Sequence, residues 1–405
     1  MKRHATSLLA RWLVAGLCAG GSVVSHQPTD ADKTLVEFRA HVVDGSIAGG
    51  YAVLVRDINN DRKPDIVGVS LRSPELAWYE NPSWARHVMV DGMSSIVNVA
   101  ANDLDGDGVP EIAMQSGFAM VADRSEGLVW LLRHDRDPAA KWKAERIDAF
   151  TTSHHIVWAD IDGDGKKELI NAPLIGPKSL APTYDQDRAP IFWYRPGSWK
   201  RETVTDAVPG ILHRVRPVSW DGTAREQLLA ASFDGITLYR SSGAGATMTW
   251  ASTRLSRGHA DDKAPRLGAS DVAVGRIAGR RMLASVEPWH GTEVVAYTES
   301  SPGEWQRRVL FSGLVEGHEI ALADFDGDGH DDIVAGDRSP RGATVHVLYA
   351  PADPGGAWIH QTLDAGKMAA SGCVTADLNT DRRADIVCIG SSTANLVWYE
   401  NAGRR

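Results

Sequence analysis

A short acidic loop that occurs five times constrains the fold of this chain more than any other feature. Each copy begins with an aspartate, and the copies read "DINNDRKPDIV", "DLDGDGVPEIA", "DIDGDGKKELI", "DFDGDGHDDIV" and "DLNTDRRADIV". Every copy places oxygen-bearing side chains at loop positions one, three, five and nine, and apolar residues follow. This spacing curls the chain so that the oxygens converge on one hard cation, with a backbone carbonyl at position seven. The loops therefore predict Ca²⁺ sites.

The predicted calcium ligands are the residues at these four positions in all five loops. They are Asp57, Asn59, Asp61, Asp65, Asp103, Asp105, Asp107, Glu111, Asp160, Asp162, Asp164, Glu168, Asp324, Asp326, Asp328, Asp332, Asp377, Asn379, Asp381 and Asp385. Glycine at position six permits a sharp turn in three loops. Arg62 and Arg382 stand there in the first and last loops, for which we expect weaker metal binding or none.

The residues around the loops indicate a β fold. The loops lack an acid at position twelve, and apolar runs such as "IVWA" and "ELINA" flank the third copy. These runs read as strands, so each loop joins a β-hairpin and is not an EF-hand. An aromatic segment such as "LAWYENP" follows each hairpin, and most units then continue with a tryptophan-led strand such as "SWARHVMVDG". Each unit thus supplies four strands.

Two degenerate units, "HRVRPVSWDGTAREQLLAAS" and "SDVAVGRIAGRRMLASV", complete a series of seven. Four-stranded units at intervals of about 46 to 59 residues predict an all-β, seven-bladed propeller. The last unit is one strand short, and "FRAHVVDG" at 38–45 imitates the fourth-strand text. We expect this N-terminal strand to complete the last blade and close the ring, which removes exposed sheet edges.

These motifs resemble known families. The loops look like the FG-GAP or VCBS repeats of seven-bladed propellers, and the likeness covers residues 34–405. Such propellers serve as adhesion ectodomains, sugar-binding modules and carbohydrate lyases. The stretches "SHHIVWADIDGDG" and "GHEIALADFDGDG" resemble, more weakly, the propeller domain of aldos-2-ulose dehydratase. That resemblance implies metal-dependent elimination of water from oxidised or anhydro sugars.

The N-terminal segment predicts export. Residues 1–25 combine Lys2 and Arg3 with an apolar stretch and small residues, as a signal peptide does, and 26–33 form a linker before the propeller. We therefore expect a secreted or periplasmic protein. Cleavage removes three positive charges and no acids, which moves the formal net charge from −9 to −12. This acidity argues against a nucleic-acid partner, and no later apolar run is long enough to span a membrane.

Two cysteines, Cys373 and Cys388, remain after cleavage and flank the last loop. They would lie nearly opposite each other in a hairpin, and an exported protein could join them in a disulfide. Whether they are joined or remain free thiols depends on the distance and direction of the two side chains. The sequence carries no signal of oligomeric state.

The candidate functional residues are expected on the face opposite the acidic loops. Connections between first and second strands lie on one face of a propeller, so residues just before the first strand meet on the other face around the channel. The positions five and six residues before the loop give His155 and His154 in the third unit, and Glu319 and His318 in the sixth. The fourth unit gives Arg214 and His213 by alignment, and the second gives Asn98.

The connections between second and third strands add further candidates on that face, namely Lys178, Tyr184, Glu287, Trp289, His290 and Arg338. Long loops on one face of a rigid scaffold are usual places for binding sites. Trp289 is a candidate platform for a sugar ring. The chain has no nucleophile elbow, no phosphate-binding glycine loop and no His-Glu-x-x-His helix, which disfavours covalent hydrolysis and nucleotide chemistry.

The leading hypothesis is a carbohydrate lyase or dehydratase that acts on a small sugar or glycan by β-elimination. A second divalent cation, Zn²⁺, Mg²⁺ or Mn²⁺, would be held by some of His154, His213, His318 and Glu319. His155 would remove a proton, Tyr184 or His290 would protonate the leaving oxygen, and the other candidates would bind substrate. The alternative is a secreted, non-enzymatic propeller for adhesion to glycans or proteins. The simpler reading of the calcium loops is a structural staple, and that of any single histidine is a strand cap.

Overall fold

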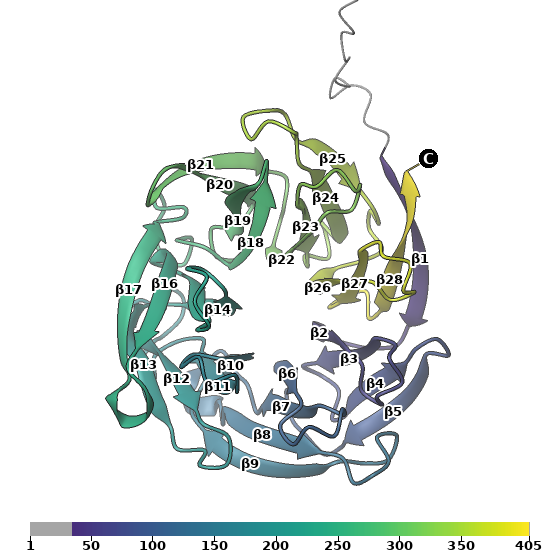
Figure 1. Cartoon of the computed structure of the whole chain (residues 1–405), viewed down its shortest axis with the longest axis vertical. Helices are drawn as coiled ribbons and strands as arrows, with labels where there is room; N and C mark the ends of the chain where they lie inside the picture. Colours follow the sequence, from purple (N-terminus) through teal and green to yellow (C-terminus); the bar gives the residue numbers. More distant parts are fainter. Residues whose placement is uncertain (1–34, 405) are drawn as a thin grey trace, which may run out of the picture. The chain divides into compact units, whose positions relative to one another are not determined.

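The computed structural model of the chain describes residues 35–404, and these form seven four-stranded antiparallel sheets. The sheets follow one another around a ring, each with its first strand at the central channel and its fourth strand outermost (Figure 1). The seven-bladed propeller predicted from the repeats is therefore confirmed. The predicted signal peptide and linker lie outside the described residues.

The strands of the first four blades run in sequence order from the channel outward. Blade one contains β2 (Gly50–Arg56), β3 (Asp65–Ser70), β4 (Leu76–Glu80) and β5 (Ala85–Val90); blade two contains β6 (Asn98–Asn102), β7 (Glu111–Ser116), β8 (Leu128–Arg133) and β9 (Lys143–Ala149). Blade three contains β10 (Ser153–Ala159), β11 (Glu168–Pro173), β12 (Arg188–Tyr194) and β13 (Glu202–Pro209); blade four contains β14 (Leu212–Val218), β15 (Gln227–Ser232), β16 (Gly235–Ser242) and β17 (Thr249–Ser256).

The remaining blades continue this order until the last. Blade five contains β18 (Asp271–Ile277), β19 (Arg280–Glu287), β20 (Glu293–Ser301) and β21 (Glu304–Phe311); blade six contains β22 (Gly317–Ala323), β23 (Asp332–Asp337), β24 (Thr344–Tyr349) and β25 (Ile359–Thr362). Blade seven contains β26 (Ala370–Ala376), β27 (Asp385–Gly390), β28 (Leu396–Arg404) and β1 (Val36–Asp44). Two short 3-10 turns, η2 (Ala122–Arg124) and η3 (Gly245–Thr247), lie in loops.

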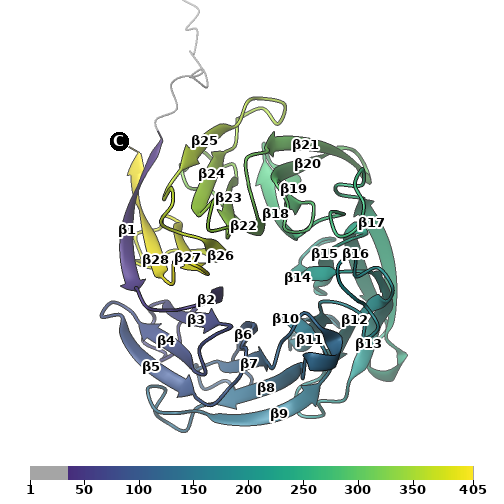
Figure 2. The same cartoon turned by 180° about the vertical axis from the view of Figure 1, so that it is seen from behind.

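The N-terminal strand closes the ring as expected. Strand β1 pairs antiparallel with β28, and His41 lies opposite Trp398 in this pairing. Figure 2 shows the two ends of the propeller meeting in one blade from the reverse side. The closure joins the first and last strands of the propeller through backbone hydrogen bonds and gives blade seven its fourth strand.

The core lies between the blades. Second strands such as β3 ("DIVGVS") are buried along their whole length, because a neighbouring blade packs on each face. Fourth strands such as β17 ("TWASTRLS") are mostly exposed and polar. Seven apolar clusters correspond to the seven interfaces between adjacent blades, and an eighth lies under loops of blades two to five.

The acidic loops connect the first and second strands and take one conformation. The aspartate at position one accepts two backbone N–H groups of its own loop, as Asp160 does from Gly163 and Gly165. Position six has a positive φ in every copy, including 70° at Arg62 and at Arg382. Arginine therefore replaces glycine there at a conformational cost, without a change of loop shape.

The degenerate units keep the hairpin and lose the acids. In blade four Gln227 replaces the carboxylate at position nine, and its Oε1 accepts the Trp220 N–H at 2.7 Å. Blade five shortens the connection to Ala278 and Gly279, with φ of 49° and 72°, which is typical of a tight hairpin turn. These two hairpins are closed without a cluster of carboxylates.

A disulfide joins Cys373 to Cys388, which resolves the choice that the sequence left open. The two residues are direct partners on β26 and β27, the two inner strands of blade seven. None of the helices in residues 35–404 has the length and apolar character that a membrane crossing requires.

Candidate active site at the channel mouth

A β-bulge at the start of the first strand creates the candidate site. In blade three Ser153 pairs with Pro173 and His155 pairs with Ala172, so His154 is an extra residue without a partner. The same irregularity recurs in four other blades, where the extra residues are Tyr51, His213, His318 and Ser371. A bulge re-aims side chains, so two consecutive residues can face the channel instead of opposite sides of the sheet.

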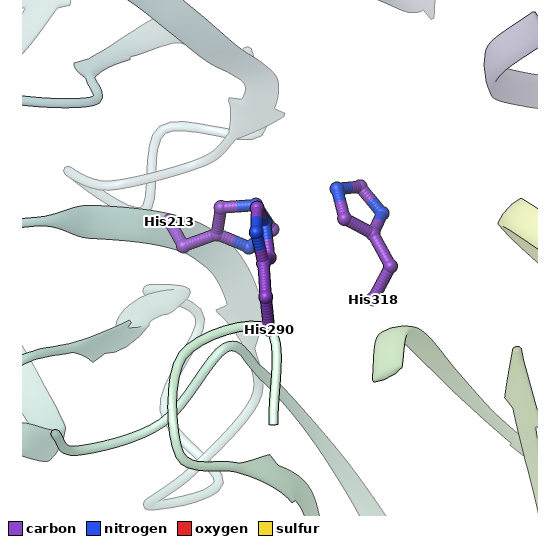
Figure 3. A group of neighbouring side chains, drawn as sticks. All are labelled: His213, His290 and His318. Carbon is purple, nitrogen blue, oxygen red and sulfur yellow. The ribbon is translucent and has the colours of Figure 1, made fainter. Parts of the chain in front are cut away.

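Three histidines from three segments converge at the mouth (Figure 3). The ligand nitrogens of His213, His290 and His318 lie within 4.8 Å of one another, close enough to hold one metal ion. Burial is the main reason that the pKa of His290 and of His318 lies well below 6.5, and it lowers the pKa of His213 to about 3. All three imidazoles are therefore neutral at physiological pH, and each has a lone pair to offer.

Backbone carbonyls fix the tautomers of two of these rings. His213 Nδ1 lies 2.7 Å from the carbonyl oxygen of Ser270, and His318 Nδ1 contacts the carbonyl oxygen of Ser371. Each Nδ1 must carry the proton that it donates, which leaves the lone pair on Nε2. This is the arrangement that metal-binding histidines use.

The third ring, His290, has a different partner. Arg338 Nη2 lies 3.0 Å from His290 Nδ1, and a guanidinium can only donate a hydrogen bond. His290 therefore carries its proton on Nε2, which lies 3.3 Å from Nε2 of His213. The indole of Trp289 stacks on this ring at a centroid distance of 4.2 Å.

A tyrosine and the first residue of the histidine pair adjoin the group. The Tyr51 hydroxyl lies 2.7 Å from His154 Nε2 and 3.3 Å from His318 Nε2. Burial raises the pKa of Tyr51 and keeps the pKa of His154 well below 6.5. The two side chains thus form a neutral proton-sharing pair beside the three histidines. We call Tyr51, His154, His213, His290 and His318 the mouth layer.

The second residue of each pair belongs to a separate layer. His155 Nε2 accepts a hydrogen bond from Arg214 Nη1 at 2.8 Å, and Arg214 Nη2 donates to Glu319. Burial lowers the pKa of His155 and raises that of Glu319, although the guanidiniums of Arg214 and Arg216 act against the latter shift. We call His155, Arg214, Asp271 and Glu319 the channel layer.

Asp271 organises the channel layer. Its carboxylate lies 3.2 Å from Arg214 Nε and 2.7 Å from Arg216 Nη2, and it also accepts the Ile320 N–H. The residue is 0% exposed. Together with Glu319 it balances the charge of two arginines that would otherwise lie unpaired in the channel wall.

Removal of this carboxylate gives a direct test of that balance. We expect Asp271→Ala to destabilise the fold by about 3–5 kcal/mol, because it leaves buried guanidinium charge without its partner. Thermal unfolding in calcium buffer measures the effect, with Asp234→Ala, which breaks an exposed pair with Arg254, as the control. A melting temperature for Asp271→Ala equal to that of the control would show that Asp271 does not carry the balance.

The other candidates from the sequence lie in different environments. Asn98 lines the channel beside His155 and makes no side-chain hydrogen bond within residues 35–404. Glu287 is 0% exposed and bound by Tyr297 and Arg307 inside blade five, so the expectation that it faces a substrate is wrong. The Lys178 side chain is exposed on its loop.

Trp289 and Tyr184 pack in the apolar cluster under the loops of blades two to five. The centroids of their two rings lie 6.1 Å apart in an edge-to-face arrangement, and His290 covers one face of the indole. Trp289 is therefore a support for His290 rather than a free platform for sugar. Tyr184 contacts this support, whereas Tyr51 is the phenol that contacts the histidines.

Each layer borders a cavity of its own. Tyr51, Ser371 and Arg338 line a cavity of about 470 Å³ on the mouth face. Asn98, His155, Arg214 and Glu319 line a second cavity of about 450 Å³ in the channel. Both volumes lie in the range of small-ligand sites. His155 of the blade-three pair lines the second cavity, whereas His154 is linked to the first cavity only through its contact with Tyr51.

Carboxylates also converge in three of the five acidic loops. The oxygens of Asp103, Asp105 and Glu111 lie within 4.8 Å of one another, and the equivalent residues of the third and sixth blades do the same. Burial raises the pKa of Glu168 to about 7, with repulsion from Asp162 in addition, and the pKa of Asp332 to about 8. Carboxylates that resist ionisation together are stabilised by a bound cation.

Several residues of the site escaped the sequence analysis. Counting back from the blade-one loop gives Tyr51 with Ala52 at the bulge position, but this pair carries less obvious chemistry than the histidine pairs and was not singled out. Asp271 belongs to blade five, which has no acidic loop from which to count. Aligning Ser270 and Asp271 with His213 and Arg214 by their strands would have found it, since His213 contacts the Ser270 carbonyl.

The fold and these loops define the protein as a seven-bladed β-propeller with FG-GAP-like repeats. A family model described as FG-GAP-like repeat matches residues 57–114. A second, described as aldos-2-ulose dehydratase, beta-propeller domain, matches residues 126–300, which is less than half of the chain. The two resemblances seen in the sequence are therefore confirmed, and the second matched segment contains the histidine pair and His290.

Comparison with solved structures supports the fold alone. Crystal structures of BBS1N in complex with ARL6DN, soaked with lead or with mercury, superpose with a TM-score of 0.54. They are 12% and 13% identical, and the match covers 90% of this chain and 96% of theirs. No curated protein matches the chain.

Proposed function

We propose that this protein is a carbohydrate dehydratase that removes water from a keto- or anhydro-sugar by β-elimination at the mouth layer. The observation that carries the proposal is the set of three neutral histidines, whose neighbours Tyr51, Ser371 and Arg338 line a sugar-sized cavity. The match to the dehydratase propeller family supports the same reaction class. The proposed calcium sites serve the scaffold on the opposite face, and the export signal in residues 1–25 supports a secreted or periplasmic location.

The donor set suits a divalent transition metal. His213 and His318 have preset Nε2 lone pairs, and His290 completes a three-histidine group once its Nε2 proton is displaced. A cation held there would polarise a ketone and stabilise the negative charge that develops on its oxygen. Glu319 belongs to the channel layer and pairs with Arg214. We therefore propose His290, and not Glu319, as the third metal ligand.

Tyr51 and His154 handle the proton in this proposal. The phenol proton passes to His154 Nε2 in the same step in which the Tyr51 oxygen removes the proton from the carbon next to the ketone. The carbon–oxygen bond then breaks, and the Tyr51 hydroxyl protonates the departing oxygen, which leaves as water. His154 finally returns its proton to Tyr51, so the pair is restored.

His155 is a poor general base in this arrangement. Its Nε2 lone pair accepts the Arg214 hydrogen bond, so this nitrogen has no lone pair free to take a proton from a substrate. We therefore move the base from His155 to the Tyr51–His154 pair. His155 holds the guanidinium of Arg214 in place instead.

The reaction leaves an unsaturated ketone, which absorbs ultraviolet light. We expect purified protein supplied with Zn²⁺ or Mn²⁺ to produce this absorbance from a keto-sugar or an anhydro-sugar. Tyr51→Phe should lower kcat by about 100- to 10,000-fold, the usual contribution of a general acid–base, with metal content unchanged. Tyr184→Phe is the matched control and should keep its rate.

Equal rates for Tyr51→Phe and the unchanged protein would exclude this mechanism. The absence of absorbance across keto-, anhydro- and uronate-containing sugars, together with glycan binding, would instead favour the non-enzymatic adhesion propeller.

A further inference from the structure

The cavity on the mouth face has a distinct chemical character. Blades one, six and seven surround it, and its volume of about 470 Å³ suits a monosaccharide or a disaccharide. Gly49 and Gly50 bring backbone close to the cavity, and serines of blade seven supply hydroxyl groups. Tyr51 is its one aromatic lining residue among residues 35–404, so the cavity offers little aromatic surface on which a sugar ring could stack.

Two arginines provide positive charge at this cavity. The Arg72 guanidinium is exposed and forms no hydrogen bond or ion pair with any part of the chain that the structure describes. Arg338 lies across the cavity, with Nη2 on His290 and Nε at 3.4 Å from Glu316, whose side chain is half exposed. Glu316 is the one acid in the lining of residues 35–404, so the arginines outnumber it.

The inner wall also has an unused hydrogen-bonding group. Ser371 is fully buried, and its Oγ has no hydrogen-bond partner among the described residues. The main-chain oxygen of the same residue contacts His318, so Ser371 links the cavity wall to the three-histidine group. Those histidines are neutral and bring no compensating negative charge to the mouth. An anionic ligand complements this whole surface.

We infer that this cavity is a carboxylate subsite and that the substrate is an acidic sugar, such as a uronate or keto-aldonate. The carboxylate is bound by Arg72 and Arg338, and Ser371 Oγ donates to it or to a neighbouring hydroxyl. Arginine suits this role because its planar donors match the two oxygens of a carboxylate. The inference rests on the proposed function for the reaction, whereas ligand binding alone tests the subsite.

The test compares D-glucuronate with its methyl ester, which has the same ring without the negative charge. Titration calorimetry of the full protein in calcium buffer, with no transition metal added, should show that glucuronate binds at least about tenfold more tightly than the ester. Arg72→Gln should remove about tenfold of the glucuronate affinity and leave that of the ester unchanged. Added salt should weaken glucuronate binding more than ester binding.

Arg280→Gln is the matched control, since Arg280 is an exposed arginine at the blade-five hairpin on the opposite face. It should bind both ligands as the unchanged protein does. Equal affinity for glucuronate and ester, or equal losses in Arg72→Gln and Arg280→Gln, would overturn the subsite even if neutral keto-sugars are dehydrated. Charge-dependent binding without any unsaturated product would keep the subsite and reject the proposed reaction.

Discussion

We expect a chelator to lower the melting temperature by on the order of 10 °C at pH 8, with a smaller effect at pH 5. Three loops bring at least three carboxylates within 4.8 Å, so calcium bound there contributes to folding. A site at a calcium concentration 100-fold above its Kd adds about 2.7 kcal/mol, and three such sites correspond to roughly that shift for a chain of this length.

The pH dependence follows from the sign of the pKa shifts. Without metal, burial raises the pKa of Asp332 to about 8 and that of Glu168 to about 7, above the usual values near 4. A raised carboxyl pKa means that the folded state holds protons that the unfolded state has lost. The metal-free protein therefore loses stability as pH rises from about 4 to 8. Calcium binds the ionised form and opposes this loss, so its benefit grows over the same range.

Differential scanning fluorimetry in calcium and in a chelator, at both pH values, measures the effect. Asp160→Ala removes the first ligand of the blade-three loop and should reduce the calcium response. Asp221→Ala changes the corresponding loop of blade four, where Gln227 takes the place of an acid, and should leave the response intact. If the melting temperature at pH 8 is the same in calcium and in the chelator, calcium does not stabilise the fold.

The blade count, the strand order and the ring closure could all be predicted because each rests on local repetition. Every loop fixes a hairpin, and every second strand must be apolar along its length to lie between two blades. Blade five retained the four-strand pattern after it lost its acids, so it still completed the count. The disulfide depended on register, which places Cys373 opposite Cys388.

The candidate site was only partly predictable, because the bulge that builds it leaves no composition signal. Counting back from the loops found His154 and His155, but the two-residue pattern did not show that His154 contacts Tyr51 while His155 lines the channel cavity. Contacts between blades decided the roles, as when Arg214 of blade four takes the lone pair of His155 from blade three. Such partners lie about 60 residues apart in the chain, and no local spacing links them.

Loss of one histidine should empty the proposed metal site. We expect His318→Ala to bind zinc more weakly than the unchanged protein when Zn²⁺ is added in calcium buffer. Loss of a residue that only hydrogen-bonds to a metal ligand costs roughly 10- to 100-fold in affinity, so loss of a ligand should cost more. Product formation should fall with the zinc affinity. His346→Ala is the control, because His346 lies in blade six, with its Nδ1 2.9 Å from Nε2 of the exposed His360. Dialysis followed by elemental analysis, with melting curves to confirm folding, gives the readout.

The same geometry predicts a gain of affinity from a second variant. Arg338 can only donate to His290 Nδ1, so it holds the proton of that ring on Nε2, the atom that faces His213. Arg338→Met removes the donor, lets the proton move to Nδ1, and frees the Nε2 lone pair for the metal. Zinc affinity should therefore rise in Arg338→Met and fall in His318→Ala. A loss of zinc in both variants would mean that Arg338 organises the histidines, and equal affinity in all proteins would mean that they do not bind the metal.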